Sequence, residues 1–84
     1  MLRVKAAWRG GVFGRPGWFL ELHLDDNWEQ DIAELKRRVP ATDRAWDEEA
    51  KRWWVAAEHE EELAKFVGGF EAYLHQMALP GLGI

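Results

Sequence analysis

The stretch Arg44-Ala-Trp-Asp-Glu-Glu-Ala-Lys-Arg-Trp-Trp-Val-Ala56 decides the fold. Tryptophan and valine favour strands, and the polar residues 48–51 between them are typical of a turn. The stretch therefore predicts a β-hairpin. Because Trp53 and Trp54 are adjacent on its second strand, they point to opposite faces of a sheet, one of them into the core. The sequence does not decide which.

Two alternating stretches nearer the N-terminus predict another hairpin. Residues 2–9 and 18–24 place apolar side chains at every second position, the period of a strand with one buried face. The apolar set is Leu2, Val4, Ala6 and Trp8 in the first strand and Trp18, Leu20, Leu22 and Leu24 in the second. The connection, residues 9–17, is longer than a tight turn needs, and its four glycines permit positive φ angles.

Two helices complete the pattern. Asp26 and Glu29 have the spacing of a capping box and predict a helix over 26–38, which Pro40 stops. Its apolar face comprises Trp28, Ile32, Leu35 and Val39. A second helix is predicted over 58–77. Inside it, Gly68-Gly69 indicates a kink or a close packing contact.

The order of these elements is ββαββα, which predicts the α+β class. We expect a mostly antiparallel sheet with the two helices packed on one face. With 84 residues the chain is long enough for a single domain, which we place at 1–78, followed by a C-terminal tail at 79–84.

Composition excludes several functions. Without cysteine there is no disulfide, thiolate metal site or thiol nucleophile. The three histidines lack the spacing of a helical metal pair, and the glycines do not form a phosphate loop. We therefore expect no enzyme, no metal and no cofactor. Signal-peptide and membrane-span patterns are missing as well, so we expect a cytoplasmic protein with no membrane partner.

Charge is distributed unevenly along the chain. Residues 1–20 carry four bases and no acid, and residues 21–84 carry the other seven bases and all fifteen acids, so +4 and −8 give the net −4. A negative total argues against coating nucleic acid by bulk electrostatics. Phe13 between Arg9 and Arg15 is a combination that stacks on bases and neutralises phosphates. The alternative is a flexible loop with a buried phenylalanine.

Residues 35–55 resemble the HARP domain, a small module of annealing helicases and related DNA-processing proteins. The shared pattern is a hydrophobic-Pro pair, then Arg-x-aromatic-Asp, then Trp and a hydrophobic residue. In this chain it falls on Val39-Pro40, Arg44, Trp46, Asp47, Trp53 and Val55. The resemblance implies binding of branched or partly single-stranded DNA, with Arg44, Lys51 and Arg52 as candidate contacts.

The sequence thus predicts a non-catalytic accessory module that binds single-stranded or forked DNA. Its candidate contacts are Arg3, Lys5, Arg9, Phe13, Arg15, Arg44, Lys51, Arg52 and Trp54. The alternative is a protein-interaction module, because aromatic residues concentrate at interfaces. That partner would be a second copy of the chain, or a larger replication or repair protein that this chain binds or inhibits.

The C-terminus adds a smaller question. Residues 76–80 loosely resemble the peptide by which bacterial proteins dock on the sliding clamp. The alternative is a tail whose Leu79, Leu82 and Ile84 fold back over the core.

Overall fold

A computed structural model describes residues 2–77. The elements are the strands β1 (Val4–Val12), β2 (Arg15–Leu22), β3 (Arg44–Asp47) and β4 (Arg52–Ala56), the helices α1 (Trp28–Arg38), α2 (Glu60–Phe66) and α3 (Phe70–Met77), and the short 3-10 helices η1 (Ala41–Asp43) and η2 (Ala57–His59). The predicted α+β order is confirmed. The predicted tail, and with it the clamp-docking peptide beyond Met77, lies outside the described residues.

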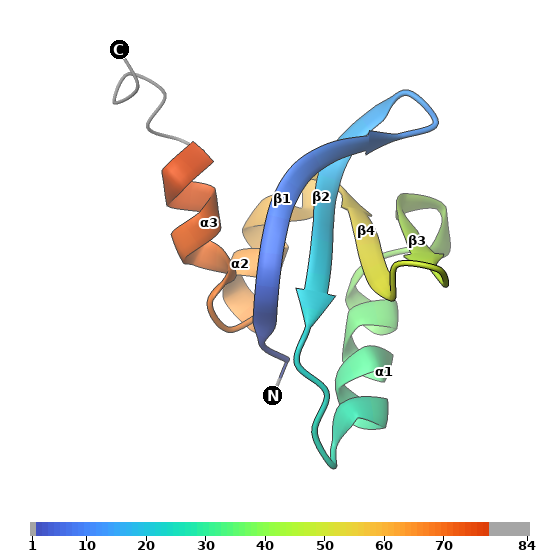
Figure 1. Cartoon of the computed structure of the whole chain (residues 1–84), viewed down its shortest axis with the longest axis vertical. Coiled ribbons are helices and arrows are strands. Elements are labelled where there is room, and N and C mark those ends of the chain that lie inside the picture. Colours follow the sequence, from blue (N-terminus) through green and yellow to red (C-terminus); the bar gives the residue numbers. More distant parts are fainter. Residues whose placement is uncertain (1, 78–84) are drawn as a thin grey trace.

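The four strands form one antiparallel sheet in the order β1-β2-β4-β3. The two hairpins therefore meet through their second strands. Helices α1 and α2 lie behind the sheet in Figure 1, and α3 follows beside β1. The predicted packing of helices on one face is confirmed.

The core lies between this face and the helices. The sheet contributes Trp18, Leu20 and Val55, which are buried together with residues of α1, α2 and α3. The edge of the Trp18 ring meets Phe70 of α3, with ring centroids 5.0 Å apart. Aromatic pairs of this geometry add stability beyond the area they bury.

Trp53 belongs to this core, and Trp54 lies on the opposite, open face. On the open face Trp8, Phe19 and Trp54 are cross-strand neighbours. Trp54 is nevertheless only 3% exposed, and its Nε1 donates a hydrogen bond to the Gly10 carbonyl oxygen at 3.0 Å.

The prediction for β1 was wrong beyond its first residues. A bulge between Val4 and Ala6 shifts the register, so that Ala7 is buried while Trp8 lies on the open face beside Phe19. A single extra residue inverts the alternation of every residue after it. Of the four apolar residues predicted to face the core from the first strand, only Leu2 and Val4 do so.

The long loop predicted at residues 9–17 is instead strand on both sides of a two-residue turn. Phe13 and Gly14 have φ angles of 53° and 77°, as a tight turn between twisted strands requires. Glycines within the strands make room for rings: a Cβ on Gly17 would lie 2.5 Å from Trp54, and one on Gly10 would lie 2.3 Å from Phe19. Close packing explains these glycines better than loop flexibility does.

The capping box predicted for α1 is also wrong. The carboxylate of Asp25 accepts a hydrogen bond from the Asn27 amide at 2.8 Å, and the helix begins at Trp28. An aspartate that bonds the backbone two residues on forms a turn of its own, which delays the helix. Asn27 makes no side-chain cap.

The helix predicted over 58–77 is broken at the glycine pair. Gly68 and the start of β1 exchange backbone hydrogen bonds, from its amide to Leu2 at 2.8 Å and from Val4 to its carbonyl at 2.9 Å. Gly69 has a φ angle of +85° and packs against Val4. The predicted close contact is confirmed, and it separates α2 from α3.

Candidate binding surfaces

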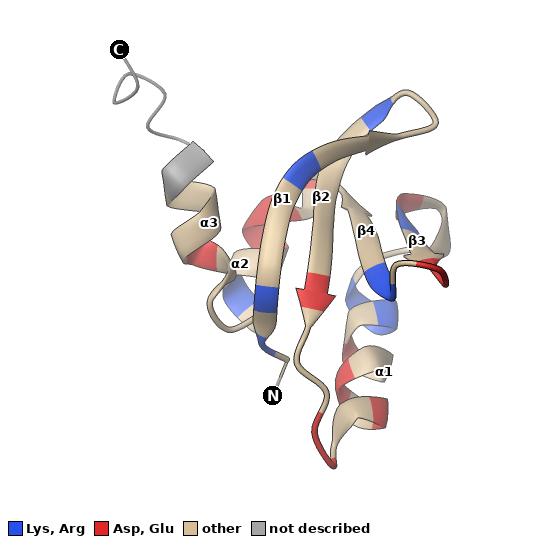
Figure 2. Ribbon diagram, in the orientation of Figure 1, with Lys and Arg blue, Asp and Glu red and all other residues tan. Residues whose placement is uncertain are grey.

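Most of the cations predicted to contact DNA are paired with acids. Ion pairs join Arg9 to Glu60 at 3.2 Å, Arg15 to Asp43 at 3.0 Å and to Glu58 at 2.9 Å, Lys51 to Glu48 at 2.7 Å, and Arg52 to Asp47 at 3.2 Å. Arg44 donates from Nε to the Val39 carbonyl oxygen at 2.9 Å. Figure 2 shows basic and acidic segments interspersed over the fold. These pairs reduce the positive potential that a phosphate backbone would meet.

Asp43 is the centre of one such network. It accepts a hydrogen bond from Arg15 of β2 at 3.0 Å and contacts Nε2 of His59 at 2.8 Å. The hydrogen bond with His59, and after it the one with Arg15, lowers the pKa of Asp43 from its usual value. Because the folded state favours the carboxylate, this contact stabilises the fold above the usual aspartate pKa and is lost as the pH falls through the lowered one.

Asp43, Glu58 and His59 each offer a ligand atom within 4.8 Å of the others, the spacing of a possible metal site. The guanidinium of Arg15 contacts both carboxylates. The Arg15 guanidinium therefore already provides the positive charge that a metal ion would bring to these carboxylates.

The open face of the sheet carries aromatic and basic side chains together. The guanidinium of Arg52 lies 4.2 Å from the Phe19 ring centroid and 5.2 Å from that of Trp8. Both rings are partly buried. The sequence predicts that Trp54 stacks on bases from this face. Trp54 is not accessible for stacking, because its ring is buried against the neighbouring strand at Gly17.

Phe13 lies at the tip of the β1–β2 hairpin with 98% of its surface exposed. The alternative of a buried phenylalanine is therefore wrong. Figure 1 shows this hairpin extending beyond the rest of the sheet.

Arg3 and Lys5, at the other end of β1, are exposed and make no ion pair with another residue of the described chain.

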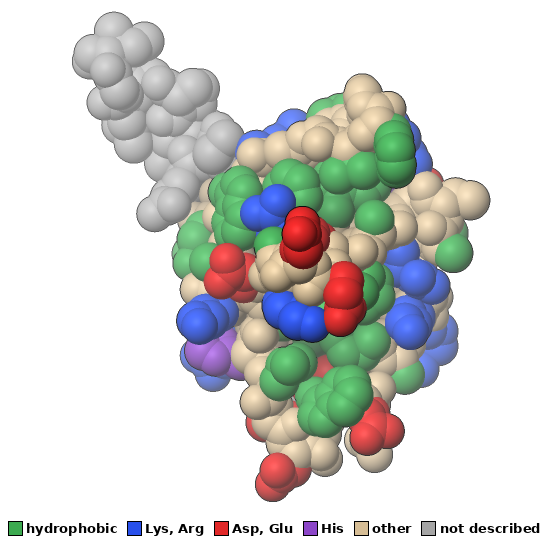
Figure 3. Space-filling model, turned by 45° about the vertical axis from the view of Figure 1, so that its right-hand side comes forward, with side chains coloured by type: hydrophobic (Ala, Val, Ile, Leu, Met, Phe, Trp, Pro, Cys, Tyr) green, Lys and Arg blue, Asp and Glu red, His purple; other side chains and the backbone are tan. Residues whose placement is uncertain are grey.

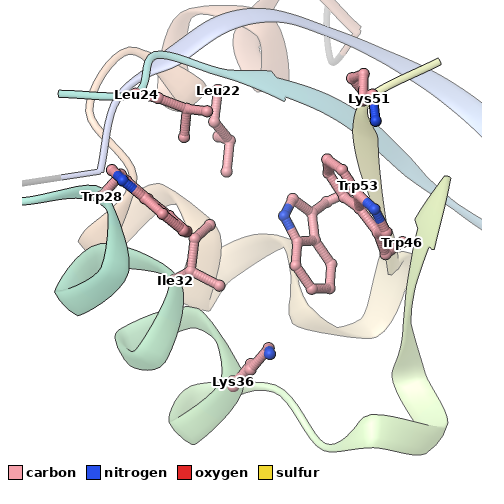
Figure 4. A pocket seen from close by; sticks show the side chains of 8 residues that line it. All are labelled: Leu22, Leu24, Trp28, Ile32, Lys36, Trp46, Lys51 and Trp53. Carbon is pink, nitrogen blue, oxygen red and sulfur yellow. The ribbon is translucent and has the colours of Figure 1, made fainter. Parts of the chain in front are cut away.

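A surface groove with a mostly apolar lining lies on the helix side of the sheet. It is a groove of about 320 Å³ between α1, the end of β2 and the β3–β4 hairpin. We call it the apolar groove, and its lining comprises Leu22, Leu24, Trp28, Ile32, Lys36, Trp46, Lys51 and Trp53. In Figure 4, Trp28 and Ile32 form the α1 side and Trp46 and Trp53 the hairpin side.

The groove is open to solvent at its rim. Leu24 is 66% exposed, Trp28 46% and Trp46 44%. Figure 3 shows hydrophobic side chains reaching the surface among charged ones. Neighbouring large apolar side chains at the surface mark interaction sites.

Glu48 organises the hairpin side of the groove. Its carboxylate accepts hydrogen bonds from Nε1 of Trp46 at 2.6 Å and from Nζ of Lys51 at 2.7 Å. The Lys51 bond, and after it the Trp46 bond, lowers the pKa of Glu48 from its usual value. Glu48 therefore stays ionised at neutral pH and holds the exposed Trp46 ring in place.

Sequence reasoning missed the groove. The sequence places Trp28 on the apolar face of the predicted helix, yet only Leu35 and Val39 of that face are fully buried, because the first turn of α1 projects past the sheet. The available signal was the position of Leu24 and Trp28 on either side of the polar residues 25–27, a kind of segment that seldom enters the core.

The fold and surfaces define a small α+β domain with a half-open apolar groove. No protein-family model, curated protein or solved structure matches this chain. The resemblance of residues 35–55 to HARP domains stays a prediction. Within residues 2–77, no helix has the length and apolar composition needed to cross a bilayer.

Proposed function

We propose that this protein is a non-catalytic binding module that docks another protein in the apolar groove. The observation that carries the proposal is the exposure of Leu24, Trp28 and Trp46 around one concave surface. Aromatic side chains in such positions supply most of the binding energy at protein interfaces. If the docked protein is a second copy of this chain, the protein forms a homodimer. Light scattering at several concentrations would detect that dimer.

The pairing of cations supports a protein partner over nucleic acid. Arg9, Arg15, Lys51 and Arg52 each contact a carboxylate, so phosphates would have to displace existing partners. An apolar partner surface leaves these ion pairs intact, and its burial in the groove releases ordered water.

Trp28→Ser is expected to weaken docking strongly and leave the fold intact. Because the ring is about half exposed, only part of its burial is lost, and the free energy of unfolding should fall by about 1–2 kcal/mol. Loss of an aromatic side chain that lines the groove should weaken binding by about tenfold or more. The measurement is calorimetric affinity for a purified protein that the immobilised wild-type chain retains from an extract of the source cells.

Phe13→Ser is the matched control, because it removes an exposed aromatic ring outside the groove. It should bind the retained protein as the wild type does. Equal binding by both variants would show that the groove is not the docking surface, and an extract from which nothing is retained would count against the proposal.

DNA association is the second candidate, favoured by one specific feature. Phe13 is 98% exposed at the end of a projecting hairpin, while Arg3 just before β1 and Lys5 within it are without an acidic partner in the described chain. The HARP resemblance supports the same function. Titration of the tryptophan fluorescence with single-stranded, duplex and forked DNA should then show a response that weakens steeply with salt and is lost in Phe13→Ser. No response at low salt would contradict it.

A further inference from the structure

Among the residues that the structure describes, the lining of the apolar groove combines apolar side chains with lysines and includes no acid. Its two charged lining residues are Lys36 of α1 and Lys51, which lies in the turn just before β4. In Figure 4 they lie on opposite sides of Trp53. The ligand that suits this lining is apolar and carries a negative group.

The two lysines are not equivalent. Nζ of Lys51 is held by Glu48 at 2.7 Å, so its charge is already compensated. Lys36 is exposed and makes no ion pair within residues 2–77. It is therefore the lysine of this surface that can receive a carboxylate without losing a partner.

The neighbours of Lys36 on α1 are already paired. Glu34 accepts from Arg37 and, at 2.7 Å, from Arg38, which also reaches Glu62 of α2 at 2.5 Å. Both arginines therefore already have carboxylate partners, and neither lines the groove. The last turn of α1 thus presents one available cation to a ligand in the groove.

We propose that the groove binds a short acidic peptide segment of a partner protein, in which a bulky apolar side chain is followed or preceded by an aspartate or glutamate. The apolar side chain enters between Trp28 of α1 and the Trp46–Trp53 pair of the hairpin, whose ring centroids are 5.2 Å apart. The carboxylate pairs with Nζ of Lys36. This inference rests on the proposed protein-docking function and names the chemistry of its partner.

A peptide fits these charges better than a nucleic acid strand does. Glu48 lies at the hairpin rim, and Asp25, Asp26 and Glu29 cluster at the start of α1. A nucleic acid strand carries a negative phosphate at every nucleotide, so a strand in the groove would be repelled by these carboxylates. A peptide with one carboxylate near Lys36 avoids them.

The test is selection of a random dodecapeptide display library on the immobilised full chain, followed by affinity measurement on a synthetic copy of an enriched peptide. Enriched sequences should place an aspartate or glutamate within a few positions of a bulky apolar residue. Lys36→Glu should weaken binding of that peptide by about tenfold, the effect of losing a charge-assisted contact. Lys36→Met should show a smaller loss.

Lys65→Glu is the matched control, because Lys65 is an exposed lysine of α2 outside the groove. It makes the same change in net charge and should leave affinity unchanged. Circular dichroism of each variant verifies that the fold is retained.

The outcomes separate the two proposals. The acidic-peptide inference would be overturned if enriched peptides bind through Trp28 but contain no aspartate or glutamate, or if their affinity is the same for Lys36→Glu as for the wild type. Either result would leave docking in the groove intact. No enriched peptide, or peptides indifferent to Trp28→Ser, would overturn both. Binding of a single-stranded oligonucleotide that is lost in Trp28→Ser and in Lys36→Glu would assign the groove to nucleic acid and overturn both.

Discussion

Phe70→Ala is expected to remove a large part of the free energy of unfolding. Phe70 is fully buried, begins α3 and packs against Trp18. Truncating a buried phenylalanine costs about 3–5 kcal/mol, and a chain of this length has a total stability of about 4–12 kcal/mol. Urea denaturation followed by circular dichroism would measure the loss.

Phe13→Ala supplies the control for this experiment. The chemical change is identical, but the side chain is 98% exposed, so the free energy of unfolding should stay within about 0.5 kcal/mol of the wild type. Similar losses in both variants, or full tolerance of Phe70→Ala, would contradict the described packing of α3 against the sheet.

The sequence predicts the β3–β4 hairpin well, because its signals are local. Trp46 and Trp53 are seven residues apart, and the polar turn places them directly opposite each other, as the register shows. The alternation of β2 is predicted correctly as far as Leu22, since Trp18 and Leu20 face the core in an unbulged strand. The prediction for Leu24 was wrong, because the strand ends at Leu22 and Leu24 is 66% exposed.

The bulge in β1 could not be predicted because its cause is distant in sequence. The start of β1 pairs with Gly68, more than sixty residues along the chain, while the rest of the strand pairs with β2. The register shift falls at Lys5, next to the residues that bond Gly68, and strand periodicity carries no sign of it.

The candidate site was hidden for the same reason. Arg15 reads as an available cation in sequence, but Asp43 and Glu58, which pair with it, are 28 and 43 residues away. The apolar groove likewise draws its lining from β2, α1 and the β3–β4 hairpin. Residue type predicted which side chains can bind, and tertiary contacts decide which remain free to do so.

Gly17→Ala is expected to destabilise the protein although it adds only one methyl group. A Cβ at this position would lie 2.5 Å from Cε2 and Nε1 of Trp54 and 2.5 Å from the Val55 carbonyl oxygen. The indole is fixed by its hydrogen bond to Gly10, and the carbonyl belongs to the neighbouring strand, so neither can move without breaking sheet contacts. Overpacking of this kind costs about 2–3 kcal/mol. For a domain of this size, the melting temperature should fall by roughly 10–20 °C.

Gly14→Asn separates this clash from a general intolerance of glycine replacement in the hairpin. Gly14 has a positive φ angle but open space around its Cα, and asparagine adopts that conformation more readily than other side chains. Its melting temperature should therefore stay near that of the wild type. Thermal unfolding followed by circular dichroism measures both variants. If Gly17→Ala melts like the wild type, Trp54 is not packed on the β2 backbone. If Gly14→Asn melts as low as Gly17→Ala, the loss arises from hairpin conformation instead of the buried contact.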